Sequence, residues 1–231
     1  MIDKIIRFQQ VASTQDTAKR FAQKGSELAV TALSQNRGRG RQGRSWFSPR
    51  GGLYVSLVLF PKKNSNSIPL LASLSVIRAL EEFGFSKLTI HWPNDVLLNK
   101  HKVCGVVCDR YRDTIICGIG LNVNIKRFGK LVANATSMSI EAGKDFDVDK
   151  VFDRFLEEFN TLYEELQDKG LKIKEVLNYI SGLGEAVEVI TAKEVVKGTV
   201  YDIDDDWALL LRDEAGLIRK YYYGDVRRLQ W

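Results

Sequence analysis

Two spacings of apolar residues alternate along residues 1–182 and predict strands interleaved with helices. Runs rich in β-branched and aromatic residues predict strands at residues 5–8, 28–34, 52–60, 88–92, 102–109 and 114–121. The last two of these strands form a hairpin that turns at residues 111–113. Apolar residues at helical spacing predict long helices at 68–83 and 148–166. A helix capped by Ser13 or Thr14 runs to about Gln23, and a shorter one ends near Ile180.

The pattern changes at the sequence Ser181-Gly182-Leu183-Gly184. Beyond it only short β-type runs occur, at residues 186–190, 197–203, 208–212 and 218–223. Turn sequences at 204–206 and 213–216 separate them. Four or five short strands in about 48 residues are typical of a small β-barrel. We therefore expect two domains, residues 1–182 and residues 183–231.

Length and composition fit one large globular domain with a small appendage. The chain has 231 residues, of which 45% are hydrophobic, and a formal net charge of +5. This mild basic excess suits an anionic ligand but does not by itself indicate nucleic acid. No apolar run approaches the roughly 20 residues of a membrane helix, and no signal sequence opens the chain. We expect a cytoplasmic protein that does not contact a membrane.

The three cysteines do not indicate a disulfide framework or a metal centre. Cys104, Cys108 and Cys117 are odd in number and lie within predicted strands, as expected for buried thiols in a reducing compartment. With only two histidines in the chain, their spacing is poor evidence for zinc. We therefore predict no metal ligands from this sequence.

The most informative stretch is residues 38–47, Gly-Arg-Gly-Arg-Gln-Gly-Arg-Ser-Trp-Phe, which we call the glycine–arginine loop. Glycine lets backbone N–H groups approach a ligand, and arginine supplies planar donors that fit carboxylate and phosphate. The loop is not a P-loop, because no Lys-Ser or Lys-Thr follows the glycines. It is not a Rossmann fingerprint, because arginine stands where that turn requires small neutral residues. The stretch predicts an enclosed anion site.

Three further stretches combine turn formers or strand glycines with side chains that can carry chemistry. Residues 91–95, His-Trp-Pro-Asn-Asp, are typical either of a rigid turn or of a turn that fixes a carboxylate at a site. Lys102 begins a strand in which Gly105 is unexpected, because glycine weakens a strand unless another group approaches its backbone. Residues 118–124 repeat this feature, and Asn122 can both donate and accept hydrogen bonds. A bulge with turn-forming asparagines would give the same pattern.

In this order the four stretches resemble the motifs of biotin–protein ligases, also called biotin–[acetyl-CoA-carboxylase] ligases. The motifs are Gly-Arg-Gly-Arg-x-Gly-Arg-x-Trp, Trp-Pro-Asn-Asp, Lys-x-x-Gly-(Ile/Val)-(Leu/Val) and Gly-Ile-Gly-(Ile/Leu)-Asn-Val-Asn. The resemblance covers essentially the whole chain. It implies an α/β (α+β) fold with a mixed β-sheet flanked by helices, followed by a small SH3-like β-barrel.

The resemblance also implies a reaction in two steps. Biotin and ATP, with Mg²⁺, give biotinyl-5′-adenylate and pyrophosphate. The ε-amine of a lysine on a biotin carboxyl carrier protein then attacks the mixed anhydride. The first step brings a carboxylate against a polyphosphate, so positive groups are the physical remedy for charge repulsion. No protein nucleophile is needed, and the sequence offers no convincing Ser-His-Asp set.

The resemblance assigns roles to individual residues. Lys102 would meet the biotin carboxyl and the α-phosphate, and Asp95 would assist transfer to the acceptor lysine. Together with Arg39 and Arg41, which close over the intermediate, these residues form the catalytic set. The implied biotin site contains Ser13, Thr14, Gln15, Gln35, Arg39, Gly40, Arg41, Lys102 and Gly105. The implied ATP and adenylate site contains Arg39, Arg41, Trp46, Asn94, Lys102 and Asn122.

The chain departs from the family motifs at a few positions. His91 stands where the family usually has lysine, Ser45 replaces a frequent lysine, and Gln15 replaces a frequent asparagine. A histidine at position 91 makes one phosphate contact weaker or pH-sensitive. Residues 224–229 begin like the family motif but lack its Ser-Leu-Arg, so no C-terminal arginine contact is carried over.

Two alternative functions remain open from the residues alone. A lipoate or octanoyl transferase shares the fold, and Lys102 close to Cys104 is similar to the Cys/Lys pairing of octanoyltransferases. A nucleic-acid-binding module would use the arginines, but the small charge excess and the glycines favour an enclosed small anion. Because the chain begins directly with the catalytic domain, we expect no winged-helix domain and no nucleic-acid partner. The oligomeric state, including a homodimer, and the acceptor protein remain open.

Overall fold

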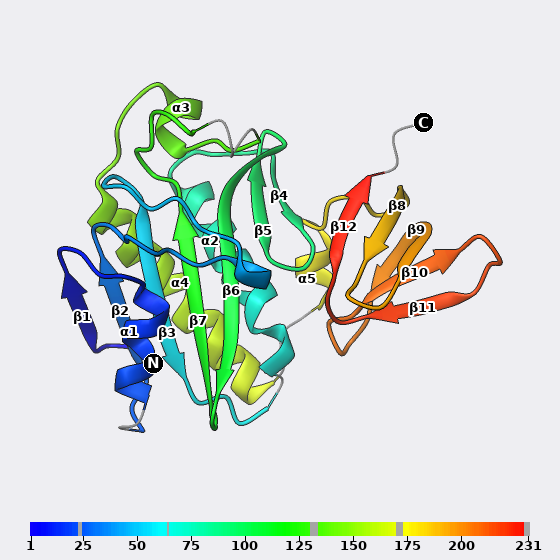
Figure 1. Ribbon diagram of the computed structural model, residues 1–231, viewed down its shortest axis with the longest axis horizontal. Coiled ribbons are helices and arrows are strands. Elements are labelled where there is room, and N and C mark those ends of the chain that lie inside the picture. Colours follow the sequence, from blue (N-terminus) through cyan, green and yellow to red (C-terminus); the bar gives the residue numbers. More distant parts are fainter. Residues whose placement is uncertain (23–24, 64, 130–133, 170–172, 229–231) are drawn as a thin grey trace.

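The computed structural model describes residues 1–22, 25–63, 65–129, 134–169 and 173–228. Its centre is a seven-stranded sheet in the order β1-β2-β3-β7-β6-β5-β4 (Figure 1). The strands are β1 (Ile5–Phe8), β2 (Leu28–Ala32), β3 (Leu53–Leu59), β4 (Leu88–His91), β5 (Asp95–Leu98), β6 (His101–Tyr111) and β7 (Thr114–Leu121). The pair β1–β2 is parallel and the other neighbours are antiparallel, so the predicted mixed sheet is confirmed.

Helices cover both faces of this sheet (Figure 1). The long helices α2 (Ile68–Glu82) and α4 (Val148–Asp168) pack against each other and against one face. The short helix α1 (Thr14–Phe21) packs on the other face, over β2, β3 and β7. On α4, Phe152, Phe155 and Phe159 are almost completely buried, and burying such a side chain contributes roughly 1.5–3 kcal/mol. The larger core thus lies behind the sheet, and the α1 face keeps room for a pocket.

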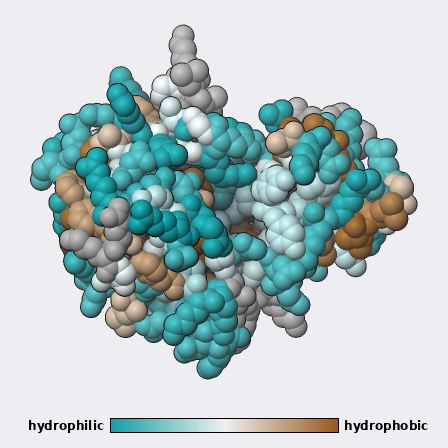
Figure 2. Space-filling view, turned by 60° about the horizontal axis from the view of Figure 1, so that its bottom comes forward, coloured by the Kyte–Doolittle hydropathy of each residue, from teal (hydrophilic) through white to brown (hydrophobic). Residues whose placement is uncertain are grey.

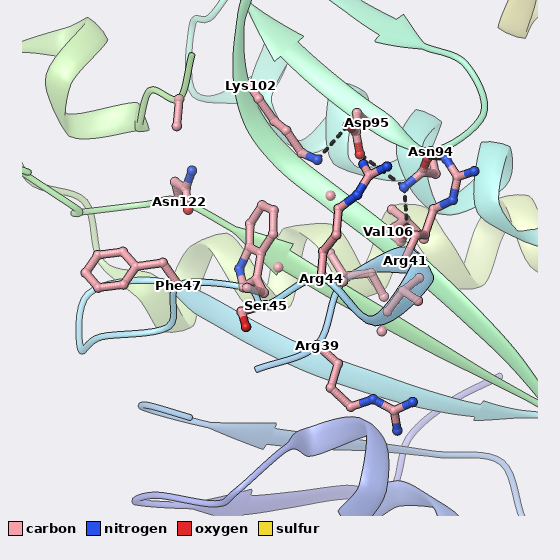
Figure 3. Close-up of a pocket in the computed structure, with 18 of the residues that line it drawn as sticks. Arg39, Arg41, Arg44, Ser45, Phe47, Asn94, Asp95, Lys102, Val106 and Asn122 are labelled. Atoms are coloured by element: carbon pink, nitrogen blue, oxygen red, sulfur yellow. Dashed lines mark hydrogen bonds and ion pairs between the residues drawn. The ribbon is translucent and has the colours of Figure 1, made fainter. Parts of the chain in front are cut away.

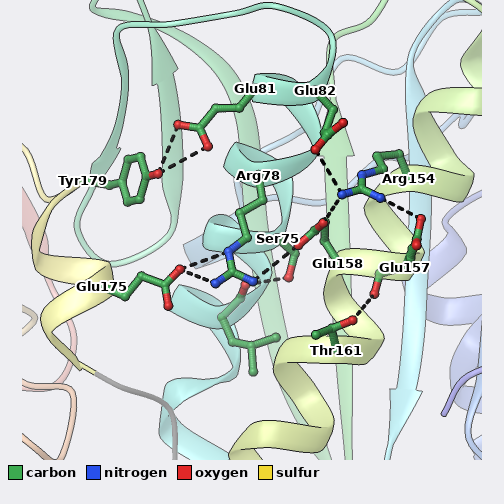
Figure 4. Close-up of polar contacts among 11 residues, drawn as sticks. Ser75, Arg78, Glu81, Glu82, Arg154, Glu157, Glu158, Thr161, Glu175 and Tyr179 are labelled. Carbon is green, nitrogen blue, oxygen red and sulfur yellow. Dashed lines mark hydrogen bonds and ion pairs between the residues drawn. The ribbon is translucent and has the colours of Figure 1, made fainter.

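Charged side chains join the helical layer to the segment that leads into the C-terminal region (Figure 4). Arg78 on α2 donates from Nη1 to Glu158 on α4 at 3.4 Å and from Nε to Glu175 on α5 (Ile173–Leu177) at 3.0 Å. Arg154 also contacts Glu158, whose side chain is only 13% exposed. Because Arg78 on α2 contacts carboxylates on both α4 and α5, the network ties three helices together.

The C-terminal region forms a second, five-stranded antiparallel sheet in the order β11-β10-β9-β8-β12. Its strands are β8 (Ala186–Ile190), β9 (Val195–Ile203), β10 (Leu209–Asp213), β11 (Ile218–Tyr221) and β12 (Asp225–Arg228). It forms a separate lobe beside the β4–β5 edge of the larger sheet (Figure 1). Hydrophilic residues dominate the molecular face in Figure 2, and apolar residues gather at the outer end of this lobe. The predicted change from helices and strands to strands alone is confirmed.

Several predicted boundaries were wrong, and two strands and one α-helix were missed. β2 ends at Ala32 and β11 at Tyr221, so both are shorter than predicted. The last short helix ends at Leu177 rather than near residue 180, because residues 179–181 pair with β4: Ile90 N donates to Tyr179 O at 2.7 Å. The predicted end of the first helix at residue 23 lies outside the described residues. The missed elements are β5, β12 and the one-turn helix α3 (Met138–Ala142).

Within the described residues, no helix has the length and apolar character needed to cross a membrane. The division at residues 182 and 183 remains a prediction.

Candidate active site

A pocket of about 620 Å³ opens on the α1 face of the large sheet, over β6 and β7. Its walls are the glycine–arginine loop, the turn between β4 and β5, and the start of β12 in the C-terminal sheet. Figure 3 shows side chains of the loop, of residues 94 and 95 and of β6 lying close together although their segments are far apart in sequence. The pocket brings together every site residue proposed from the sequence: Ser13, Thr14, Gln15, Gln35, Arg39, Gly40, Arg41, Trp46, Asn94, Asp95, Lys102, Gly105 and Asn122.

One end of the pocket is neutral and polar. Gln35 Oε1 accepts from Thr14 N at 2.8 Å and from Thr14 Oγ1 at 3.1 Å, which fixes the start of α1. Gln15 Nε2 donates to the Ile116 carbonyl at 2.8 Å. Ser56 Oγ lies 2.8 Å from Thr14 Oγ1 and 3.0 Å from Gln15 Oε1. Amide and hydroxyl groups held this rigidly can recognise an uncharged polar head group by hydrogen bonds.

The glycine–arginine loop folds back on itself above the pocket. Trp46 N donates to Gly38 O at 2.9 Å, and a side chain on Gly38 would lie within 2.5 Å of Trp46 O and Ser48 Oγ. Gly38 is therefore required by close packing within the loop. Gln42 and Gly43 adopt the left-handed backbone conformation, with φ of 54° and 73°.

The loop arginines already have partners. Arg39 extends toward α1, where its Nη1 lies 2.6 Å from Asp16 Oδ1 (Figure 3). Arg41 Nη2 donates to the Gly224 carbonyl at 2.9 Å, and Arg44 pairs with Asp225. Guanidinium groups that hold protein carboxylates and carbonyls in this way can exchange them for ligand oxygens.

Trp46 explains the two glycines in adjacent strands. Its indole lies on the sheet where β6 and β7 carry Gly105 and Gly120, which are paired in register. A Cβ atom would come 2.9 Å from Trp46 Cζ3 at Gly105 and 2.4 Å from Trp46 Nε1 at Gly120. The predicted close approach to these glycines is confirmed, and the approaching group in this structure is the indole. Its Nε1 faces Gly120 and is buried without a hydrogen-bond partner among the described residues.

The turn between β4 and β5 and the start of β6 supply an ion pair at the centre of the pocket. Lys102 Nζ lies 2.5 Å from Asp95 Oδ2 and 5.3 Å from the centroid of the Trp46 ring. Asn94 Nδ2 donates to the Val106 carbonyl at 2.7 Å, which anchors the turn to β6, and its Oδ1 accepts from Arg41. Across the pocket, Asn122 Nδ2 donates to the Thr136 carbonyl at 2.9 Å. The turn therefore fixes the Asp95 carboxylate at the site, which is the second of the two interpretations that the sequence of residues 91–95 allowed.

Burial changes the protonation chemistry of two groups. It lowers the pKa of the Arg41 guanidinium; nearby Asp225 and Asp95 act in the opposite direction, and Arg44 lowers the pKa further. Burial also raises the pKa of the Cys104 thiol, which is completely enclosed in the core behind the sheet. A protonated thiol outside the pocket cannot serve as a nucleophile. The Cys/Lys pairing considered from the sequence is therefore not formed here.

Among the described residues, no three His, Cys, Asp or Glu side chains cluster as a metal site. The pocket carboxylates, Asp95 and Asp225, are each paired with a cation. These residues do not form a set of protein ligands for Mg²⁺. In sites that bind nucleotides, this ion is commonly coordinated by the phosphates of the substrate.

Sequence reasoning missed part of the lining. Ser56 had a visible signal, because it is the one polar residue in the apolar strand Leu53–Leu59. Asp225, Val226 and Arg227 of the C-terminal sheet also line the pocket, and the partial family motif at residues 224–229 was the sequence signal for them.

Comparisons with known proteins agree on one relationship. A sequence profile described as "Biotin/lipoate A/B protein ligase family" matches residues 7–125, and one described as "Biotin protein ligase C terminal domain" matches residues 182–228. The "Bifunctional ligase/repressor BirA" of Bacillus subtilis is 34% identical over 94% of this chain and 71% of its own length. The "Biotin--[acetyl-CoA-carboxylase] ligase" of Paracoccus denitrificans is 30% identical, over 81% of this chain and 85% of its own.

A solved structure extends the similarity to three dimensions. The biotin protein ligase from Aquifex aeolicus in complex with biotin and ATP superimposes with a TM-score of 0.91 at 32% identity. The match covers 99% of this chain and 100% of that one. The arrangement of both sheets is therefore common to the two proteins.

Proposed function

Because the chain belongs to the biotin/lipoate A/B protein ligase family, we propose that it is a biotin–protein ligase that attaches biotin to a lysine of a carrier protein. The enzyme first joins biotin and ATP as biotinyl-5′-adenylate and releases pyrophosphate. It then transfers the biotinyl group to the acceptor amine. The observation that carries this proposal is one pocket whose neutral polar end adjoins a cationic end at Lys102.

The neutral end suits the ureido ring of biotin. Ser13, Thr14, Gln15 and Gln35 present amide and hydroxyl groups there, and Gly105 lies beside the biotin pocket. With these groups on one side, the biotin carboxylate points toward Lys102 and the loop.

The cationic end suits the reacting anions. Lys102 holds the biotin carboxylate and the α-phosphate together, and Arg39, Gly40 and Arg41 close over them. Positive charge at this point offsets the repulsion between a carboxylate and a polyphosphate and stabilises the charge that moves to pyrophosphate. Trp46 shields the mixed anhydride from water, Asn94 positions Arg41, and Asn122 lies where adenine binds.

Asp95 acts in the second step. The acceptor amine must lose a proton before it attacks the anhydride, and the Asp95 carboxylate accepts it or orients the amine. In the present arrangement Lys102 occupies that carboxylate at 2.5 Å. The incoming α-phosphate competes for Lys102, and this frees Asp95 for the amine.

The remaining proposals concern partners. Mg²⁺ enters as the MgATP substrate, since the pocket carboxylates are already paired. The acceptor is a biotin carboxyl carrier protein, the compartment is the cytoplasm, and a homodimer is the oligomeric form to test. Residues 1–182 act as the catalytic domain and residues 183–231 as a smaller SH3-like domain.

Calorimetric titration with biotin, lipoate and an oligonucleotide tests the function. We expect tight binding of biotin alone, tighter binding with ATP, and pyrophosphate release that needs both. Incubation with a carrier domain must then add one biotinyl group to one lysine. Preference for lipoate would favour a lipoate ligase, and binding of the oligonucleotide alone would favour a nucleic-acid module.

A further inference from the structure

Gly224 and the first two residues of β12, Asp225 and Val226, contact segments that form the walls of the pocket. The Gly224 carbonyl accepts from Arg41 Nη2 at 2.9 Å, and the Asp225 carboxylate pairs with Arg44 and, at 3.8 Å, with Arg41. The Val226 carbonyl lies 3.0 Å from His91 Nε2. Residues 224–226 therefore link the C-terminal sheet to both the glycine–arginine loop and the β4–β5 turn.

The backbone of this segment is fixed by the C-terminal sheet. Asp225 pairs in register with Ile190 of β8, so β12 is a regular strand from its first residue. Gly224 has φ of 152°, and a Cβ there would lie 3.1 Å from the Ile190 carbonyl. A glycine is required at this position, and the Asp225 side chain that follows it lines the pocket.

The contact with Asp225 is partly shielded from water. The side chains of Asp225 and Arg41 are 22% and 23% exposed, whereas that of Arg44 is 60% exposed. Ion pairs at such positions are stronger than fully exposed ones, and they restrict the guanidinium groups to one orientation. A carboxylate of the C-terminal sheet thus pairs directly with Arg44 and lies 3.8 Å from Arg41, which the Gly224 carbonyl and Asn94 also hold above the pocket.

We infer that Asp225 is a positioning residue, through which the C-terminal sheet holds Arg41 and Arg44 closed over the biotinyl-adenylate. The inference rests on the proposed function. It adds that retention of the intermediate depends on a carboxylate outside the catalytic sheet, which touches the loop and not the reacting atoms. Loss of the carboxylate loosens the loop and lets the adenylate escape before an acceptor arrives.

The test measures escape directly. Labelled biotinyl-adenylate is formed on the enzyme, excess unlabelled biotin is added, and release of label is followed. We expect Asp225→Asn to release adenylate about tenfold faster, equivalent to about 1.4 kcal/mol. Biotin affinity without ATP should stay within about twofold, because the neutral end of the pocket is untouched. Asp225→Glu should restore slow release.

Matched variants separate positioning from charge and from folding. Asp206→Asn makes the same charge change on an exposed pair with Lys220, away from the pocket, and should release adenylate like the wild type. Arg44→Gln should accelerate release, and Asp225→Asn with Arg44→Gln should be no faster than Asp225→Asn. If Asp225→Asn does not fold, Arg44→Gln carries the test alone.

A wild-type rate of adenylate release in Asp225→Asn would overturn the inference. If Asp225→Asn does not fold, a wild-type rate in Arg44→Gln would overturn it. So would equal acceleration in Asp206→Asn, or an equal loss of ATP-free biotin binding in Asp225→Asn. Failure of the proposed function has a different signature, since the wild-type enzyme would then form no adenylate.

Discussion

Replacing Gly120 with alanine tests whether the Trp46 indole needs the bare backbone of β7. The added Cβ would lie 2.4 Å from Trp46 Nε1, 2.6 Å from Cε2 and 3.0 Å from Cδ1. Carbon atoms pack best at roughly 3.5–4.0 Å, so the ring must move by about 1 Å. Overpacking of this size costs about 1–3 kcal/mol. We expect the lower half of that range, because Trp46 is only half-buried and can shift into the pocket.

The displaced ring should damage binding more than stability. Movement away from Gly120 brings the indole into the space that biotin and the adenylate need, so we expect at least a tenfold rise in the KM for biotin. Urea denaturation gives the change in unfolding free energy, and pyrophosphate release gives KM. Gly129→Ala is the control, because no described residue other than its chain neighbour lies within 4 Å of a Cβ at that position.

A double variant decides whether the indole is the cause. Once Trp46→Ala removes the ring, the added methyl group has space, so Gly120→Ala should cost almost nothing in that background. Additive effects of the two substitutions would refute the reasoning. So would a Gly120→Ala protein with the urea midpoint and KM of the wild type.

Four other substitutions probe the chemistry and the frame of the site. The Arg41→Gly enzyme should release biotinyl-adenylate, which then labels lysines of other proteins. Mass spectrometry of bystander proteins measures this labelling, and labelling no higher than with the wild type would show that Arg41 does not retain the intermediate. Lys102→Ala should slow adenylate formation, measured by pyrophosphate release, by about 10²–10³ with little change in stability, and an unchanged rate would remove Lys102 from the site. Asp95→Asn should still form adenylate but transfer it slowly in single-turnover assays, with the defect easing as pH rises, since the acceptor lysine has a reference pKa near 10.4. Normal transfer with failed adenylation would instead assign Asp95 to substrate positioning. Glu158→Gln should lower the free energy of unfolding by about 1–3 kcal/mol, because it leaves Arg78 without one of its carboxylate partners, and a urea midpoint equal to that of the wild type would contradict this.

Most strands of the large sheet could be predicted from the local pattern of apolar and β-forming residues. Strands such as β3 and β7 are continuous runs of β-forming residues, and the hairpin turn after Tyr111 was predicted at the correct place. β5 was missed because its four residues directly follow a turn, although Val96 and Leu98 alternate with more exposed neighbours. β12 has one apolar residue among its described side chains, Val226, and it is a strand because β8 supplies its hydrogen-bond partners.

The sequence by itself determined the chemistry of the site. The three arginines of residues 38–47, the carboxylate of Asp95 and the amine of Lys102 are fixed by residue type and spacing, and all of these residues line one pocket together with Gly40. Tertiary structure alone decided which groups they meet. Register across β6 and β7 places Gly105 beside Gly120, and together they seat Trp46.

Asp225 contacts Arg41 and Arg44, from which it is separated by more than 180 residues of sequence. Contacts of this kind depend on how whole sheets pack, because a side chain's partners are set by the placement of its element in space and not by its neighbours along the chain. The sequence therefore determined which groups act, and only the tertiary structure decided which partners hold them.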